Sequence, residues 1–260
     1  MSNSKSPGLP PELALDGRIA TITLRRPEVG NRLELEDLAL LREQLCLVND
    51  RKEVLVLRLR GQGRHFCSGF NLAQAASEGA VATAGASFEA LASEIERVRP
   101  VTIAAINGGF HGGATDLALA CDFRIGVTGA RMFVPAAQIG LVFYRGGLER
   151  YVRRLGLGPA KRVLLAAEEL DARQMLDCGF LDEVVEPEAL EAAVTALSER
   201  LAGMAPLALL PMKRHLDAIA AGTLDAATLA RDIARADASQ DQREGVAARL
   251  QKRPPEFHGH

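Results

Sequence analysis

The pattern of apolar and polar positions predicts a strand followed by a helix in the first fifty residues. Apolar and β-branched side chains fill positions 19–24, and Pro27 closes the run, which is typical of a strand. From Asn31 the apolar spacing changes to intervals of three and four residues. This spacing places four side chains on one face of a helix: Leu38, Leu41, Leu45 and Val48.

Strands and helices continue to alternate through about residue 200. Apolar runs predict strands at 54–59, 101–106, 123–127 and 180–185, and the intervening patterns predict helices at 87–99, 114–121, 147–154, 159–167 and 171–177. After Pro187 the pattern is helical only. The order predicts an α/β core over residues 1–200 and a helical C-terminal region over 201–260. Apolar runs in that last region indicate packing on the core or on another subunit.

Composition narrows the class of protein. The 260 residues are 48% hydrophobic and 25% charged, which excludes disordered, collagen-like and coiled-coil chains. A net charge of −2 provides no field for a nucleic-acid partner. No apolar run reaches the ~18 residues that a membrane span needs, and no signal peptide opens the chain, so we expect no membrane partner and a cytoplasmic location.

The cysteine and histidine positions give no metal signature. Four scattered cysteines, without a CxxC pair, are typical of reduced thiols. The terminal segment 257–260 carries two histidines, and we expect it to be a frayed, solvated tail.

Two glycine-rich segments, 61–69 and 108–113, each follow an apolar run. Neither matches a dinucleotide-binding or P-loop fingerprint. The Gly113 amide would lie in the first turn of the predicted helix 114–121, where the helix dipole favours negative charge. The break at Ser68 and Gly69 would free a second amide. Two such converging amides would form an oxyanion hole.

Three stretches of the chain resemble the signature segments of the crotonase, or enoyl-CoA hydratase/isomerase, superfamily: RPEVGNRL (26–33), GQGRHFCSGFNL (61–72) and INGGFHGGATDLALACD (106–122). The resemblance runs from about residue 12 to 215. It implies a spiral of ββα units with a helical C-terminal region, a homotrimer or dimer of trimers, and an acyl-CoA thioester as substrate without a further cofactor. It places the oxyanion amides at Ser68 and Gly113.

The same resemblance suggests where the chain would hold CoA. Cations are needed for the phosphates of CoA, and arginines lie in or beside the matching segments. The candidates for CoA contact are Arg25, Arg26, Arg64, Phe66 and Lys213. For any single arginine, a solvated surface role is an equal alternative.

The chain departs from the family pattern at the two positions where hydratases carry their catalytic acids. Hydratases of this family carry two glutamates around the attacking water, whereas the matching positions here hold Asp116 and Ala136. A proton shuttle needs only one base, so isomerisation, decarboxylation or retro-type C–C cleavage fits better than hydration. Asp116 is the predicted acid–base, with an ion-paired structural residue as the alternative. An apolar pocket would raise its pKa.

Two further side chains are candidates to complete the site. Tyr144 could orient a thioester or donate a proton, or its ring could pack in the core. His111 precedes the glycines of the second segment and could reach the acyl group, or could be a hydrogen-bonded structural residue. A non-catalytic CoA-binding or scaffold protein remains the alternative function, because Ala136 removes one acid.

Overall fold

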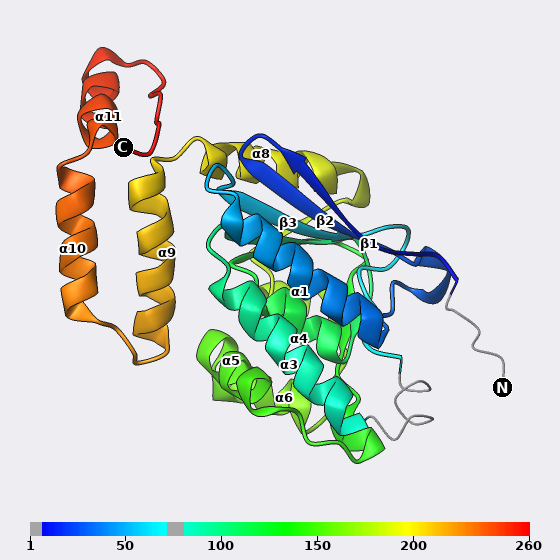
Figure 1. Cartoon of the computed structure of the whole chain (residues 1–260). Coiled ribbons are helices and arrows are strands. Elements are labelled where there is room, and N and C mark those ends of the chain that lie inside the picture. Colours follow the sequence, from blue (N-terminus) through cyan, green and yellow to red (C-terminus); the bar gives the residue numbers. More distant parts are fainter. Residues whose placement is uncertain (1–6, 72–80) are drawn as a thin grey trace.

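A six-stranded sheet forms the centre of the computed structural model, which describes residues 7–71 and 81–260 (Figure 1). Its strand order is β1-β2-β3-β4-β6-β9, and only the β1–β2 pair is antiparallel. The strands are β1 (Leu9–Asp16), β2 (Ile19–Arg25), β3 (Val56–Gly61), β4 (Val101–Ile106), β6 (Phe123–Val127) and β9 (Glu183–Val185). A second sheet contains β5 (Phe110–His111), β7 (Arg131–Phe133) and β8 (Leu170–Asp171).

Helices cover both faces of the large sheet because its parallel strands are apolar on both sides. In β4, Ile103 and Ala105 pack toward α8 (Leu190–Ala202), while Ala104 and Ile106 belong to the main core. The main core lies under three helices: α1 (Leu35–Asp50), α3 (Val81–Arg97) and α4 (Gly113–Ala120). The remaining helices of this part are α5 (Arg145–Leu155), α6 (Leu157–Leu164) and α7 (Ala172–Asp177), with short 3-10 turns at Pro27–Val29, Ala136–Ile139 and Pro187–Ala189. The mixed α/β class is confirmed.

The C-terminal helices stand beside the sheet layers rather than over them (Figure 1). They are α9 (Pro206–Ala220), α10 (Ala226–Asp237) and α11 (Gln240–Gln251). The chain end folds back on α11: the His258 and Gly259 amides each donate to the Asp241 carboxylate at 2.8 Å, and the Gln240 amide donates to the His260 carbonyl. The expected frayed tail is therefore wrong, because a buried carboxylate holds it.

Two predicted boundaries shift for local reasons. The first helix begins at Leu35 rather than near Asn31, because Asn31 has a φ of 54° and Glu34 forms a capping box with Asp37. The last strand shortens to β9, because the Phe180 and Leu181 amides both donate to the Met175 carbonyl at the end of α7.

Among the described helices, none alone has both the length and the apolar character to cross a membrane. Only Pro187–Ala202 and Pro206–Ala220 taken together reach that length and composition, and they are bent by 110°.

Candidate active site

The two glycine-rich segments lie side by side at the N-terminal end of α4. The His111 amide donates to the Cys67 carbonyl at 3.0 Å. A Cβ built on Gly69 would lie 2.6 Å from the His111 carbonyl oxygen and 3.7 Å from the Gly113 amide nitrogen. Gly69 also has a φ of +87°, so both space and conformation favour glycine there. This close approach brings the chain after Gly69 next to the first turn of α4.

The backbone amides at this junction differ from the expected pair. Gly113 begins α4, so its amide has no acceptor within the helix. The Ser68 amide donates to the Gly30 carbonyl at 2.7 Å, so Ser68 is wrong as an oxyanion donor. Two residues further, the Phe70 amide meets no acceptor among the described residues. Nothing in the side chains of this segment signals which amide is free, because strand pairing decides it.

Asp116 lies in the first turn of α4 and is fully enclosed, with an exposed fraction of 0%. Its carboxylate accepts from the Tyr144 hydroxyl at 2.8 Å and from Nη1 of Arg150 at 3.1 and 3.2 Å. Burial raises the pKa of Asp116 to about 6, although Arg150 and the Tyr144 hydrogen bond both oppose the rise. A carboxyl group with this pKa can accept and return a proton near neutral pH.

Tyr144 occupies the N-cap position of α5, and its ring stacks on Phe143 at 4.6 Å. Its hydroxyl is the group that reaches Asp116. Burial and the neighbouring carboxylate raise the pKa of Tyr144 well above its usual value. The side chain therefore stays a phenol and a hydrogen-bond donor at neutral pH. The Tyr144 ring packs against the core and its hydroxyl is bonded to Asp116, while its role toward a substrate stays a prediction.

No acid lies at position 136. Ala136 begins a 3-10 turn and packs, half-buried, against the core. The nearby acids of α3 are engaged with α5: Glu89 accepts from the Gly146 amide at 2.6 Å, and Glu96 forms ion pairs with arginines of α5. Asp116 is therefore the carboxylate that the fold places beside the free amides. Among the described residues, no His, Cys, Asp and Glu side chains form a group able to hold a metal ion.

His111 lies beside this cluster but does not join it. Its ring is half-buried near the ring of Phe133, and its Nδ1 has no hydrogen-bond partner among the residues described. Burial and nearby His65 lower the pKa of His111, so the imidazole is neutral at pH 7. No hydrogen bond within the described chain links His111 to Asp116 or Tyr144. Its catalytic role stays a prediction.

A model of the enoyl-CoA hydratase/isomerase family matches residues 15–260. The chain belongs to this family. It is 30% identical to a crotonyl-CoA hydratase of Syntrophomonas wolfei over 94% of this chain and 96% of that protein. It is 32% identical to an enoyl-CoA isomerase/hydratase of Mycosarcoma maydis, which covers 92% of each. The crystal structure of an enoyl-CoA hydratase from Bacillus anthracis superposes with a TM-score of 0.88 at 27% identity, covering 97% of this chain and all (100%) of that one. The crotonase fold is confirmed, and an acyl-CoA substrate is consistent with the family.

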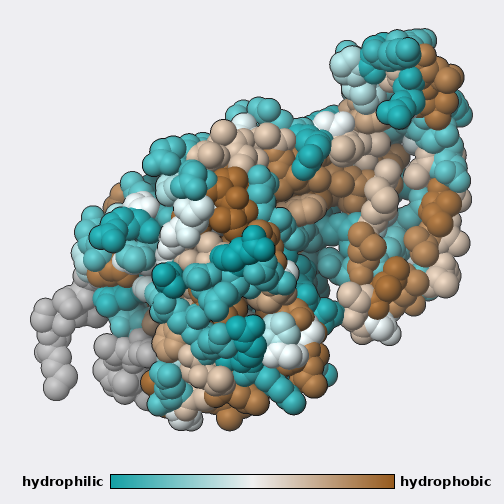
Figure 2. Space-filling model, turned by 180° about the vertical axis from the view of Figure 1, so that it is seen from behind, coloured by the Kyte–Doolittle hydropathy of each residue, from teal (hydrophilic) through white to brown (hydrophobic). Residues whose placement is uncertain are grey.

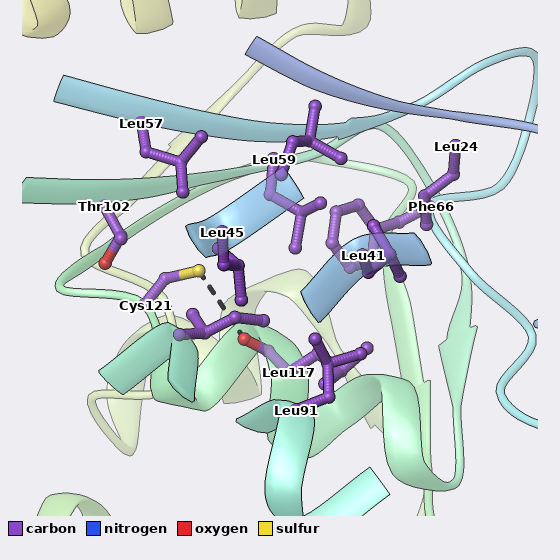
Figure 3. A pocket seen from close by; sticks show the side chains of 12 residues that line it. Leu24, Leu41, Leu45, Leu57, Leu59, Phe66, Leu91, Thr102, Leu117 and Cys121 are labelled. Atoms are coloured by element: carbon purple, nitrogen blue, oxygen red, sulfur yellow. Dashed lines mark hydrogen bonds between the residues drawn. The ribbon is translucent and has the colours of Figure 1, made fainter. Parts of the chain in front are cut away.

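Within this family member, two of the candidates for CoA contact make contacts inside the fold. Phe66 is fully buried, packs edge-on against Phe110 and lines a small apolar cavity of about 20 Å³ inside the core (Figure 3). Lys213 donates to the Pro100 carbonyl at 2.7 Å and pairs with Asp122 at 2.8 Å, with a nearly buried side chain. The expectation that Phe66 contacts CoA is wrong, because its side chain is fully buried. Lys213 is ion-paired but lines a groove beside α9, so its contact with CoA stays a prediction.

The arginine candidates divide by their partners. Arg26 forms a two-pronged pair with the buried Asp37 at 3.0 and 2.9 Å, which assigns it to the fold and corrects the expected ligand role. Arg25 pairs with Glu12 at the surface at 2.8 Å. Arg64 is exposed and has no ion-pair partner in the described part of the chain. Among these arginine candidates, Arg64 is therefore the one whose guanidinium is accessible to a phosphate group of CoA.

Proposed function

We propose that this chain moves protons on acyl-CoA thioesters through an enolate, acting as an isomerase or lyase rather than as an efficient hydratase. The observation that carries the proposal is the enclosed Asp116, whose pKa is about 6, beside free amides and without an acid at position 136. Such a group suits proton abstraction and return.

In the proposed reaction, the Phe70 and Gly113 amides hold the thioester oxygen. Asp116 takes a proton from carbon, the electron pair of that C–H bond forms the enolate, and the negative charge gathers on the held oxygen. Asp116 then returns the proton to a different carbon, which moves the double bond. Each oxyanion donor typically contributes about 3 kcal/mol to transition-state stabilisation. The CoA carried by the substrate is the only cofactor that this chemistry needs.

Tyr144 and His111 have unequal parts in the proposal. The Tyr144 hydroxyl fixes one carboxylate oxygen of Asp116 and keeps the acid oriented. Because Tyr144 reaches the surface while Asp116 does not, movement of its ring would admit the acyl group. His111 has no hydrogen bond to this pair, so we assign it no proton transfer.

Hydration is the weaker activity in this account. It requires one group to activate water and another to protonate the α-carbon, and Ala136 supplies neither. Several similar proteins are named hydratases, which makes crotonyl-CoA the natural comparison substrate.

The test compares crotonyl-CoA, 3-enoyl-CoA, a dienoyl-CoA and a malonyl-type CoA as substrates. We expect turnover of a 3-enoyl, dienoyl or malonyl-type thioester to exceed crotonyl-CoA hydration. Asp116→Asn should lose about a hundredfold or more in kcat, while CoA binding by calorimetry is retained. Rapid hydration of crotonyl-CoA, or full activity in the variant, would contradict the proposal.

The non-catalytic alternative makes a different prediction in the same assay. The alanine at position 136 favours it, because a scaffold protein could retain the fold and the CoA site after losing one of the two acids. Tight CoA binding without turnover of any of the four thioesters would support that alternative.

We also propose that residues 201–260 form contacts between copies in a homotrimer or a dimer of trimers. In α9 only His215 is buried, and no residue of α10 is. A groove of about 1190 Å³ separates these helices from the core, and Figure 2 shows apolar side chains on them. Unpaired apolar surface of this kind is typical of an interface.

A further inference from the structure

Arg150 is a buried ion-pair partner of Asp116 that no sequence motif singled out. Its exposed fraction is 1%, and Nη1 contacts both carboxylate oxygens of Asp116. The same Nη1 donates to the Gly146 carbonyl at 3.0 Å, one α5 turn earlier. Nη2 faces Glu96 on α3 at 3.4 Å. The guanidinium is thus fixed by three elements at once.

Helix α5 presents one continuous face to α4. Tyr144 precedes α5, and Tyr151 follows seven residues later, two turns along the same side of the helix, while Arg150, one residue before Tyr151, also reaches α4 at Asp116. The Tyr151 hydroxyl donates to the Thr115 hydroxyl at 2.6 Å, next to Asp116. A buried arginine costs free energy that an apolar side chain would not, and its Nε has no acceptor among the described residues. Packing alone therefore does not explain the choice of arginine.

We propose that Arg150 is a positioning residue that holds the Asp116 carboxylate in one orientation and in its anionic form. The inference rests on the proposed function, in which Asp116 must begin the reaction as a base. A planar guanidinium suits this task because it fixes both the direction and the charge of a carboxylate, whereas an ammonium supplies charge alone.

The groups around Asp116 have opposing effects on the pKa of its carboxyl group. Arg150 and, more weakly, Arg154 of α5 favour the anion, as does the Tyr144 hydroxyl. Burial and Glu96 of α3 favour the neutral acid. Since Arg150 contributes the largest effect in favour of the anion, its removal should move the titration of Asp116 to higher pH.

The experiment follows the Asp116 carboxyl group by infrared difference spectroscopy against pH, with Asp116→Asn identifying the band. Wild type should titrate near pH 6. Arg150→Gln should titrate at least about one unit higher, and the acid limb of kcat/KM should move with it. Arg153→Gln is the matched control, because Arg153 is a neighbouring arginine that pairs with Glu96 and does not contact Asp116. It should titrate as wild type.

Arg150→Lys keeps the positive charge beside Asp116 but removes the planar guanidinium that orients its carboxylate. This variant tests the positioning role even if Arg150→Gln does not fold. It should titrate within about half a unit of wild type, while kcat falls roughly tenfold or more at unchanged KM. A wild-type kcat in Arg150→Lys, or an unshifted band in folded Arg150→Gln, would overturn the inference. A shifted band in Arg150→Gln with no change in activity would refute the role of Asp116 as the base and leave the effect of Arg150 on its charge established.

Discussion

At the scale of single residues, the surroundings of Asp116 set the pKa of its carboxyl group and so decide whether it can act as a base. The sequence predicted an acid–base role for Asp116, and it predicted a raised pKa for this carboxyl group because the pocket was expected to be apolar. Burial raises that pKa to about 6, while an arginine and a phenol restrain the rise. The balance of these effects leaves an anion at neutral pH that is ready to accept a proton.

Gly69 offers a test of the junction between the two glycine-rich segments. Gly69→Ala places a Cβ 2.6 Å from the His111 carbonyl oxygen at a φ of +87°, so the loop must move away from Gly113. We expect the free energy of unfolding to fall by at least about 1 kcal/mol and kcat to fall roughly a hundredfold.

Gly129→Ala provides the control for that substitution. Its added Cβ would meet no atom within 4 Å, and Gly129 has an ordinary φ. Chemical denaturation and steady-state kinetics of both variants measure the difference. Equal behaviour of the two variants would mean that the approach of Gly69 to α4 has no part in the reaction.

At the scale of elements, the sequence predicted the helices and strands that bury apolar stripes. The run 101–106 became β4, and the run beginning near Gly113 became α4, because periodicity reports burial directly. The three short strands of the second sheet were missed, since two- and three-residue strands carry no periodicity. Backbone pairing also escaped prediction, which is why the sequence indicated Ser68, whose amide donates to the Gly30 carbonyl.

The contact between α4 and α5 could not be predicted either. Thirty-four residues separate Asp116 from Arg150, and only the packing of the two helices shows that they meet. The same holds for the loss of Phe66 and Arg26 as ligand candidates, since their partners lie elsewhere in the sequence. Sequence patterns identify candidate functional side chains, while tertiary packing decides which of them are engaged in contacts within the fold and which can reach a ligand.

At the scale of the whole molecule, the C-terminal helices leave apolar surface without a partner. Leu216 on α9 is 66% exposed, and Ile219 on the same helix is 56% exposed. We predict that the wild-type chain has the mass of three or six copies by light scattering, and that Leu216→Glu shifts it toward monomer because a buried unpaired charge is costly.

Leu47→Glu is the matched control for this substitution. Leu47 on α1 is similarly exposed, at 57%, but lies outside the C-terminal helices, so this variant should keep the wild-type mass. A monomeric wild-type chain at micromolar concentration would contradict the proposed assembly.

The proposed reaction requires Asp116 to act as a base toward an acyl-CoA. The most direct measurement is deuterium incorporation from D2O into the carbon chain of 3-enoyl-CoA, followed by NMR across pH 4–8. We predict that the exchange rate rises through an apparent pKa of about 6, since Asp116 must be ionised to accept the proton, and that Asp116→Asn abolishes exchange. Exchange that persists in Asp116→Asn, or that does not change between pH 4 and 8, would contradict the account.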